Sequence, residues 1–339
     1  MLASMALWDS LADLEVRIDG YTLHRRELAV RPEFTRVTTT VVLDGDGETG
    51  QGEDVTYTPA DHDAFPTALM LAGTYTLDDY SRRLSEQELW GSDPAMAASV
   101  DYRRWAFESA ALDLALRQAG RSLGDVLGRD YGPVRFVAST RAEIEPWLEL
   151  YPELEFKLDV DSDWDRGLMG RLAEYDRVRV LDLKAYYRGT VVDLAPDPEL
   201  YRAVAESFPE AVIEDAWLED GCREALSGAE DRLSFDAPVH SLDDLDSLPL
   251  APRWLNIKPS RFGTLRTLVE CIDACEERAI RMYGGGQFEL GPGRRQIQRL
   301  ASLFYADSPN DVAPSEYNEG PPRPGLPPSP LPTPEGIGL

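Results

Sequence analysis

The second half of the chain alternates short apolar runs with helical patterns, and this alternation restricts the fold more than any other feature. Seven runs of β-like composition cover residues 134–138, 154–160, 178–183, 211–214, 233–236, 254–258 and 279–283. Helical patterns separate the runs. At residues 197–208, for example, Asp197 is the expected N-cap and Pro198 opens the first turn. A strand–helix unit repeated about seven times predicts a parallel barrel, whose active site lies at the carboxyl ends of the strands.

The first part of the chain follows a different pattern. Residues 14–58 predict antiparallel strands with a hairpin turn at 44–47, and a helical pattern over 105–116 ends near Gly120. From residue 318 the chain is rich in proline, which predicts a tail that is either extended or folded back onto the N-terminal region. We expect an N-terminal α+β domain over 1–130, a barrel over 131–317 and a Pro-rich C-terminal tail over 318–339.

Lysine is nearly absent. Only Lys157, Lys184 and Lys258 occur among 34 basic residues, and each lies near the end of an apolar run. Arginine is always protonated, whereas a buried lysine can lose its proton and act as a base or a Schiff-base amine. The three lysines are therefore candidate catalytic residues. The alternative is a codon bias that left three lysines by chance.

The overall charge excludes several partners. A formal net charge of −27 argues against nucleic acid and against an anionic membrane surface, because no basic track is present to neutralise phosphates. Three cysteines, two of them four residues apart on a helical pattern, argue against a disulfide framework. With no signal peptide and no run of eighteen apolar residues, we expect a soluble, cytoplasmic protein.

Acids stand at the ends of three consecutive predicted strands. They are Asp182, Glu214 and Asp236. A single acid there would more often be a solvated loop residue, but three from neighbouring strands would form an all-oxygen site suited to Mg²⁺. The sequence therefore predicts a Mg²⁺ cofactor held by these carboxylates.

These motifs resemble the enolase superfamily, specifically its muconate-lactonizing, o-succinylbenzoate-synthase and dipeptide-epimerase branch. The resemblance extends to about Tyr317, and its most specific parts are Ile-Lys-Pro-Ser at 257–260 and the triple glycine at 284–286. The matching stretches are residues 50–53, 107–113, 156–159, 181–184, 213–215, 235–236, 256–263 and 284–294. The resemblance implies a modified TIM barrel, (β/α)7β, with an N-terminal α+β capping domain. It also implies Mg²⁺ on the three acids and lysine bases facing each other across the substrate.

The implied activity is that of a lyase or isomerase. Such an enzyme removes a proton α to a carboxylate through an enediolate, and the outcome is dehydration, cycloisomerisation, an o-succinylbenzoate-synthase-like reaction or epimerisation. The expected partner is a small-molecule carboxylate, and a homo-oligomer is compatible with the resemblance. A divalent cation would stabilise the developing negative charge and would lower the pKa of a nearby lysine.

One motif departs from the family pattern. Relatives carry Lys-x-Lys on the second strand and Asp-x-Asn on the third, whereas this chain has Lys157-Leu-Asp159 and Asp182-Leu-Lys184. Residues two apart on a strand share a face, so Lys184 would lie opposite Asp159. Either Lys184 supplies the missing base in a charge swap, or it forms an inert ion pair with Asp159 and Lys258 is the sole base. The candidate catalytic residues are Lys258, Lys157 and Lys184.

Other residues and functions stay open at this point. Asp159, Gln287 and Glu289 are expected substrate contacts. Asp311 would lie on an eighth strand or cap a turn, and His240 would lie at the barrel mouth or on a surface turn. A Schiff-base lysine aldolase and a catalytically degenerate barrel that binds a metal or ligand are the alternative functions.

Overall fold

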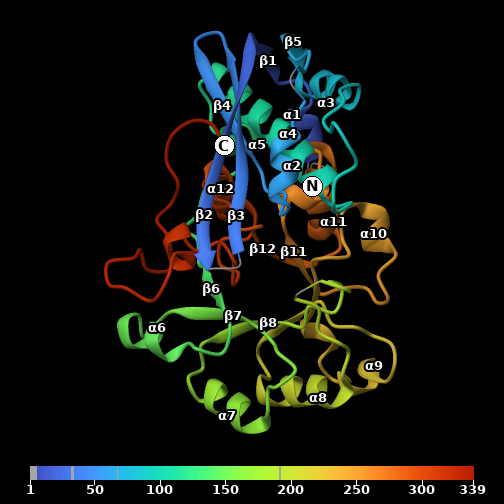
Figure 1. The fold of residues 1–339 in the computed structure, drawn as a ribbon, viewed down its shortest axis with the longest axis vertical. Coiled ribbons are helices and arrows are strands. Elements are labelled where there is room, and N and C mark those ends of the chain that lie inside the picture. The colour runs from blue at the N-terminus through green and yellow to red at the C-terminus, as the bar shows by residue number, and fades with distance from the viewer. Residues whose placement is uncertain (1–5, 32–33, 67, 191) are drawn as a thin grey trace.

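The computed structural model describes residues 6–31, 34–66, 68–190 and 192–339. It contains two structural regions, an antiparallel cap and a parallel barrel (Figure 1). Among the described residues, none of the helices combines the length and the hydropathy that a membrane span requires.

The cap is built on a three-stranded antiparallel sheet, β2 (Gly20–Arg31), β3 (Phe34–Gly45) and β4 (Glu48–Asp54). The long helix α4 (Ser99–Gln118) packs against β4. Glycine permits this close approach, because a Cβ atom at Gly50 or Gly52 would lie 2.3 or 2.0 Å from a carbonyl oxygen of α4. Shorter elements complete the cap: α1 (Leu7–Leu11), β1 (Glu15–Ile18), α2 (Pro59–Asp63), β5 (Gly73–Thr76), α3 (Leu77–Ser85) and α5 (Leu123–Leu127).

The barrel is a curled parallel sheet of seven described strands in the order β12-β11-β10-β9-β8-β7-β6. Its strands are β6 (Val137–Thr140), β7 (Glu155–Asp159), β8 (Val178–Asp182), β9 (Val212–Glu214), β10 (Leu233–Phe235), β11 (Trp254–Ile257) and β12 (Arg281–Gly284). Each of the seven predicted strands is present, within three residues of its predicted ends. The predicted fold class is confirmed.

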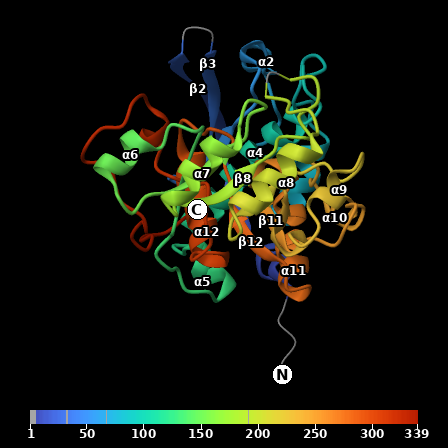
Figure 2. The same cartoon turned by 90° about the horizontal axis from the view of Figure 1, so that it is seen from below.

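Helices follow each strand and cover the outside of the barrel (Figure 2). They are α6 (Glu145–Leu150), α7 (Arg166–Glu174), α8 (Pro198–Ser207), α9 (Cys222–Ala225), α10 (Leu242–Asp246), α11 (Leu265–Glu277) and α12 (Pro292–Phe304). Asp197 caps α8 as predicted, accepting hydrogen bonds from the backbone N–H groups of Glu199 and Leu200.

A two-residue eighth strand closes the barrel. Asn310 forms a parallel bridge to Phe136 beside β6, and Asp311 forms one to Gly285 beside β12. The Asn310 side chain reinforces the closure, because its Oδ1 accepts from Gly284 N at 2.7 Å and its Nδ2 donates to Arg135 O at 2.9 Å. The sequence left two positions open for Asp311, an eighth strand or a turn. The structure places it on the eighth strand.

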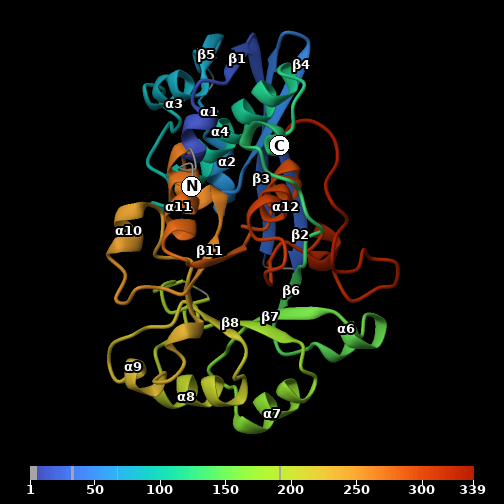
Figure 3. The same ribbon diagram turned by 180° about the vertical axis from the view of Figure 1, so that it is seen from behind.

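The Pro-rich tail runs back along the molecule to the cap (Figure 3). Leu331 bridges Val134, and the last residue, Leu339, is buried and donates its backbone N–H to Asp113 of α4 at 2.9 Å. Arg299 of α12 donates to the carbonyl of Gly338 at 3.3 Å. The tail therefore fastens α12 of the barrel to α4 of the cap.

Arg36 of β3 makes a second junction between cap and barrel. Its guanidinium is fully buried and donates to carbonyl oxygens on both sides, those of Val55 (2.6 Å) and Thr56 (2.7 Å) in the cap and of Gln287 (2.8 Å) and Phe288 (3.1 Å) in the barrel. A planar guanidinium is suited to several simultaneous acceptors, which an ammonium group is not. Arg36 therefore fixes the loop after β12 against the cap.

Replacing Arg36 by Met is expected to destabilise the protein. The change keeps the apolar volume but leaves buried carbonyl groups without donors, which costs about 1–3 kcal/mol for each group that stays unpaired. Urea unfolding should show a fall in the unfolding free energy of roughly 2–4 kcal/mol. Arg36→Lys is the control for charge and should recover only part of the loss. An Arg36→Met protein as stable as the wild type would contradict this role.

Candidate metal and active site

The sheet register brings the predicted site residues to one end of the barrel. Asp159 of β7 pairs with Asp182 of β8, and Asp182 pairs with Glu214 of β9. Asp236 and Lys258 follow β10 and β11 by one residue. Because all of these strands are parallel, their carboxyl ends open on the same face of the barrel, toward the cap.

Four buried carboxylates occupy this face. Oxygen atoms of Asp182, Glu214 and Asp215 lie within 4.8 Å of one another, an arrangement that could hold a metal ion. Asp236 is equally buried, but its carboxylate contacts Lys258 Nζ at 2.7 Å and Arg261 Nε at 2.9 Å. Two of the three acids predicted as metal ligands, Asp182 and Glu214, thus lie in this group together with Asp215, which was not assigned a role, whereas Asp236 is held by its own cations.

Asp215 joins the cluster through an unusual backbone conformation. Neighbouring residues on a strand point to opposite faces, so Glu214 and Asp215 would be expected to diverge. Asp215 has φ of +54°, which places it just past the strand in a left-handed turn. Its carboxylate accepts the backbone N–H groups of Asp236 (2.8 Å) and Ala237 (3.1 Å). In the sequence, only the Glu214-Asp215 doublet at the end of a predicted strand indicated that Asp215 could join the cluster.

Lys157 lies beneath the acids and is 1% exposed. Its ammonium contacts Glu214 Oε1 at 2.5 Å and Asp182 Oδ2 at 3.2 Å, with Asp311 Oδ2 at 3.8 Å. Burial lowers the pKa of Lys157, but the three carboxylates outweigh burial and raise it well above its ordinary value. This direction is opposite to the lowered pKa expected for a lysine beside a divalent cation.

Lys184 bridges two acids. Its ammonium lies 2.5 Å from Asp182 Oδ2 and 3.1 Å from Asp159 Oδ1, so the predicted Asp159–Lys184 pair is present. Strand β8 ends at Asp182, and Lys184 has φ of +52°, which turns its side chain back over that acid. Burial lowers the pKa of Lys184 and the two acids raise it, and the net change is upward. This direction, like that of Lys157, is opposite to the one expected for a lysine beside a divalent cation.

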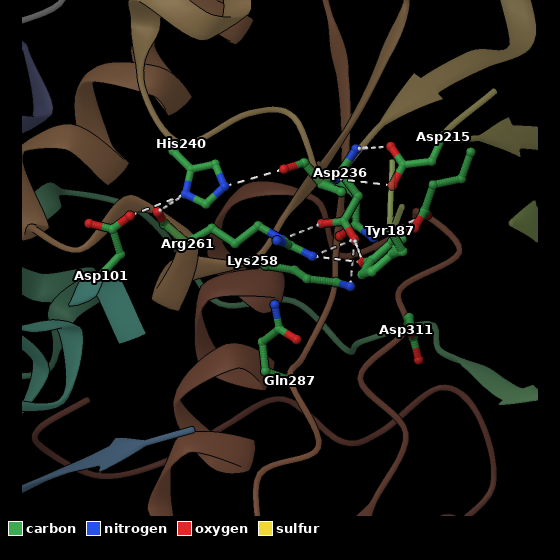
Figure 4. A network of polar contacts seen from close by, with 12 residues as sticks. Asp101, Tyr187, Asp215, Asp236, His240, Lys258, Arg261, Gln287 and Asp311 are labelled. Carbon is green, nitrogen blue, oxygen red and sulfur yellow. Dashed lines mark hydrogen bonds and ion pairs between the residues drawn. The ribbon is translucent and has the colours of Figure 1, made fainter. Parts of the chain in front are cut away.

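Lys258 and Arg261 converge on Asp236, and Tyr187 donates to the same carboxylate at 3.1 Å (Figure 4). His240 points away from this group. One ring nitrogen, Nδ1, lies 3.2 Å from Asp101 of α4 and 3.0 Å from the Arg261 carbonyl. His240 therefore links the barrel to the cap. Arg261 was not predicted, although it lies in the matched stretch that contains Lys258.

Opposing charges determine the protonation of the acids. Burial raises the pKa of Glu214 to about 7, although Lys157 lowers it. Burial also raises the pKa of Asp236, but Arg261 and Lys258 outweigh burial and bring it below its ordinary value. Burial and the surrounding acids raise the pKa of Asp215 well above its usual range. Burial therefore favours the neutral form of Glu214 and Asp215, whereas Arg261 and Lys258 favour the ionised form of Asp236.

A pocket of about 530 Å³ opens over the cluster, between the barrel and the cap. Lys157, Lys184 and Lys258 line it. Of the three expected substrate contacts, Asp159 and Gln287 line the pocket, whereas Glu289 is absent from its wall and lies 3.0 Å from Arg294. Gln287 is held by Tyr57 and Tyr102 of the cap at 3.2 Å each, so cap and barrel together form the wall.

The fold is similar to that of solved structures of the enolase superfamily. A dipeptide epimerase from Methylococcus capsulatus, solved with Mg and the dipeptide L-Arg-D-Lys, superposes with a TM-score of 0.71 at 18% identity, covering 95% of this chain and 100% of the other. An enolase from Thermobispora bispora, solved with magnesium and formate, gives a TM-score of 0.72 at 17% identity, covering 95% and 89%. These likenesses establish the fold.

Sequence comparisons agree with the fold. The chain is 25% identical over 222 residues to an o-succinylbenzoate synthase of Bacillus subtilis (strain 168), covering 61% of this chain and 58% of the relative. It is 29% identical over 246 residues to an N-succinylamino acid racemase of Amycolatopsis sp, covering 66% and 64%. The chain thus spans less than two thirds of the length of either relative. The resemblance to the enolase superfamily is confirmed.

The chain also matches a domain family over most of its length. Residues 9–126 match the N-terminal domain, and residues 130–319 the C-terminal domain, of a family described as a domain of unknown function, DUF8230. This protein belongs to that family.

Proposed function

We propose that this protein is a Mg²⁺-dependent lyase or isomerase that removes a proton α to the carboxylate of a small molecule. The observation that carries the proposal is the convergence of buried acids and three lysines at the strand ends, under a pocket that the cap closes. The enolase-superfamily relatives support the same reaction class.

The donor set fits a hard divalent cation. All candidate ligands are carboxylate oxygens, as Mg²⁺ prefers, and they are fully buried. Asp182, Glu214 and Asp236 would hold the ion, with Asp215 fixed behind them by the backbone of the Asp236 loop. The ion would stabilise the negative charge that develops on the substrate carboxylate as the α-proton leaves.

Lysines would perform the proton transfer. Lys258 is the principal candidate base, since it lines the pocket and its partner Asp236 would be drawn to the cation. Lys157 lies across the cluster and would help to hold the substrate carboxylate. The pairing of Lys184 with both Asp159 and Asp182 supports the ion-pair role for this lysine. A single base favours elimination, cycloisomerisation or a stereospecific proton transfer over racemisation.

The double variant Asp159→Asn, Lys184→Asn tests the ion-pair role. It removes both charges of the Asp159–Lys184 pair together, and Asp182 keeps Lys157 as a cation partner at 3.2 Å. If Lys184 is structural, the folded double variant should exchange substrate α-protons within about threefold of the wild-type rate, as measured by NMR in deuterated water. Lys184→Asn alone is the control and should be the less stable protein. Loss of exchange in a folded double variant would instead identify Lys184 as a second base.

The proposed function has a direct test. Incubation with candidate carboxylates and MgCl₂ in deuterated water should place deuterium at the α-carbon, and EDTA should stop the exchange. A Schiff-base aldolase would instead be inactivated by borohydride in the presence of a carbonyl substrate and would tolerate EDTA. The ion pairs of all three lysines argue against a free amine nucleophile. Mg²⁺ binding without exchange of any carboxylate would favour the degenerate barrel.

Three expectations accompany this function as proposals. They are the cytoplasmic location, the absence of nucleic-acid and membrane partners, and the domain limits of 1–130, 131–317 and 318–339. The net charge of −27 supports the second of them. Homo-oligomerisation remains compatible with them.

A further inference from the structure

We infer that the substrate is a monocarboxylate that carries one apolar group of about the size of a phenyl ring. The inference rests on the proposed function and narrows it to a substrate class. Three features of the pocket support it: an apolar outer wall, lining cations that are already paired with acids, and a wall loop that is held by hydrogen bonds from the cap.

The outer wall of the pocket is apolar. Phe34 of the cap and Phe288 of the barrel meet across it, with ring centroids 6.5 Å apart. Met96 and Val192 also line the pocket and are 39% and 38% exposed, among the most exposed large apolar side chains in the described part of the chain. Exposed apolar side chains at a pocket indicate a site for an apolar ligand group. The charged cluster at the strand ends and this apolar wall therefore favour a ligand with one charged end and one apolar end.

The cations that line the pocket are already paired with acids. The described residues place five cations in its lining, and each has an acid partner. Seven carboxylates either line the pocket or contact one of these cations, and one of the seven, Asp236, also contacts Arg261 at 2.9 Å. The cations are Arg141, Lys157, Lys184, Lys258 and Arg294, and the acids are Asp159, Asp161, Asp182, Glu214, Asp236, Glu289 and Asp311.

A second ligand carboxylate would therefore find no free cation. Of the five lining cations, Arg294 is nearest to Phe288 in the chain, six residues after it, and Glu289 already neutralises it at 3.0 Å. Burying an uncompensated carboxylate is costly, whereas burying an apolar group there is favourable. The pocket volume of about 530 Å³ also exceeds the needs of a simple short acid.

The apolar wall is rigid. Phe288 has φ of +56°, and Arg36 holds the carbonyls of Gln287 and Phe288 at 2.8 and 3.1 Å. A second hollow of about 280 Å³ shares Ser139, Phe288 and Asn318 with the pocket and extends the space behind Phe288. Binding an apolar group therefore requires little rearrangement of this wall.

Calorimetric titration of the full-length protein in MgCl₂ with three matched probes tests the inference. Propionate has only the carboxylate end, 3-phenylpropionate adds a phenyl group, and benzylsuccinate adds a second carboxylate arm to that. We expect 3-phenylpropionate to bind roughly 10- to 100-fold more tightly than propionate, from the apolar area of a buried ring. Benzylsuccinate should bind about tenfold more weakly than 3-phenylpropionate. Benzylsuccinate binding as tightly or more tightly, or propionate binding as well as 3-phenylpropionate, would overturn the inference.

A variant locates the phenyl subsite. Phe288→Ala should reduce the preference for 3-phenylpropionate over propionate by about tenfold. Tyr175→Ala, which truncates an exposed aromatic outside the pocket, should leave the preference unchanged. An undiminished preference in a folded Phe288→Ala protein would also overturn the inference. Failure of all three probes to bind in Mg²⁺ would reject the proposed function together with the inference, whereas tight benzylsuccinate binding would reject the inference alone.

Discussion

Replacing Glu214 by Gln is expected to abolish specific Mg²⁺ binding. Glu214 lies between the other acids: it pairs with Asp182 in the sheet register, contacts Lys157 at 2.5 Å and accepts from Asn256 at 3.1 Å. A neutral amide keeps the shape but removes the central negative charge from a site whose affinity depends on carboxylate charge. Calorimetry should show binding weakened by at least about 100-fold, more than the 10- to 100-fold typical of residues behind the ligands. Thermal stabilisation by MgCl₂ should disappear as well.

A control next to the same strand isolates the effect. Glu210 is exposed in the turn before β9, four residues before Glu214, and Glu210→Gln changes the net charge by the same amount. This variant should bind Mg²⁺ like the wild type. Mg²⁺ binding that survives in Glu214→Gln would remove this residue from the metal site and would shift attention to Asp182 and Asp215.

Replacing Lys258 by Arg is expected to lower α-proton exchange by about 10²- to 10⁴-fold, the usual contribution of a positioned general base. Arginine keeps the positive charge opposite Asp236, which Lys258 contacts at 2.7 Å, but its pKa is too high for it to accept a proton near neutral pH. Mg²⁺ binding should remain close to wild type, because the charge next to the metal cluster is unchanged. The measurement is deuterium incorporation by NMR, with calorimetry of Mg²⁺ binding on the same sample.

The matched variant Lys184→Arg separates a base from a structural cation. Its charge would still offset Asp182 and Asp159, so an ion-pair role predicts that exchange falls far less than in Lys258→Arg. Full exchange activity in Lys258→Arg would exclude Lys258 as the base. A comparable loss in both variants would indicate that two lysines share the proton transfer.

The local sequence pattern was sufficient to predict most residues of the cluster of acids and lysines. Asp182, Glu214 and Asp236 each end an apolar run, and parallel strands align their carboxyl ends, so pattern alone predicts that the three acids converge. The same reasoning placed Lys258 at the end of the predicted strand 254–258, and the structure ends β11 one residue earlier, at Ile257. It also predicted the hairpin between β3 and β4, because an Asp-Gly turn favours one.

The acid that was missed depends on local conformation. Asp215 reaches the cluster with a positive φ, which ends the alternation of faces that strand reasoning assumes. The pKa directions of Lys157 and Lys184 depend on how many carboxylates surround each ammonium. That number follows from packing and not from sequence spacing.

By itself, the sequence determined the order of strands and helices, the barrel class and the acids at the strand ends. These properties follow from periodicity and composition, which act over a few residues at a time or over the whole chain. Only the tertiary structure decided how the cap meets the barrel. Arg36 donates to a carbonyl 252 residues away, and Leu339 donates to Asp113 across 226 residues. Such contacts form because buried polar groups need hydrogen-bond partners, and these can come from any part of the chain that folds next to them. A local sequence pattern does not predict which part that is.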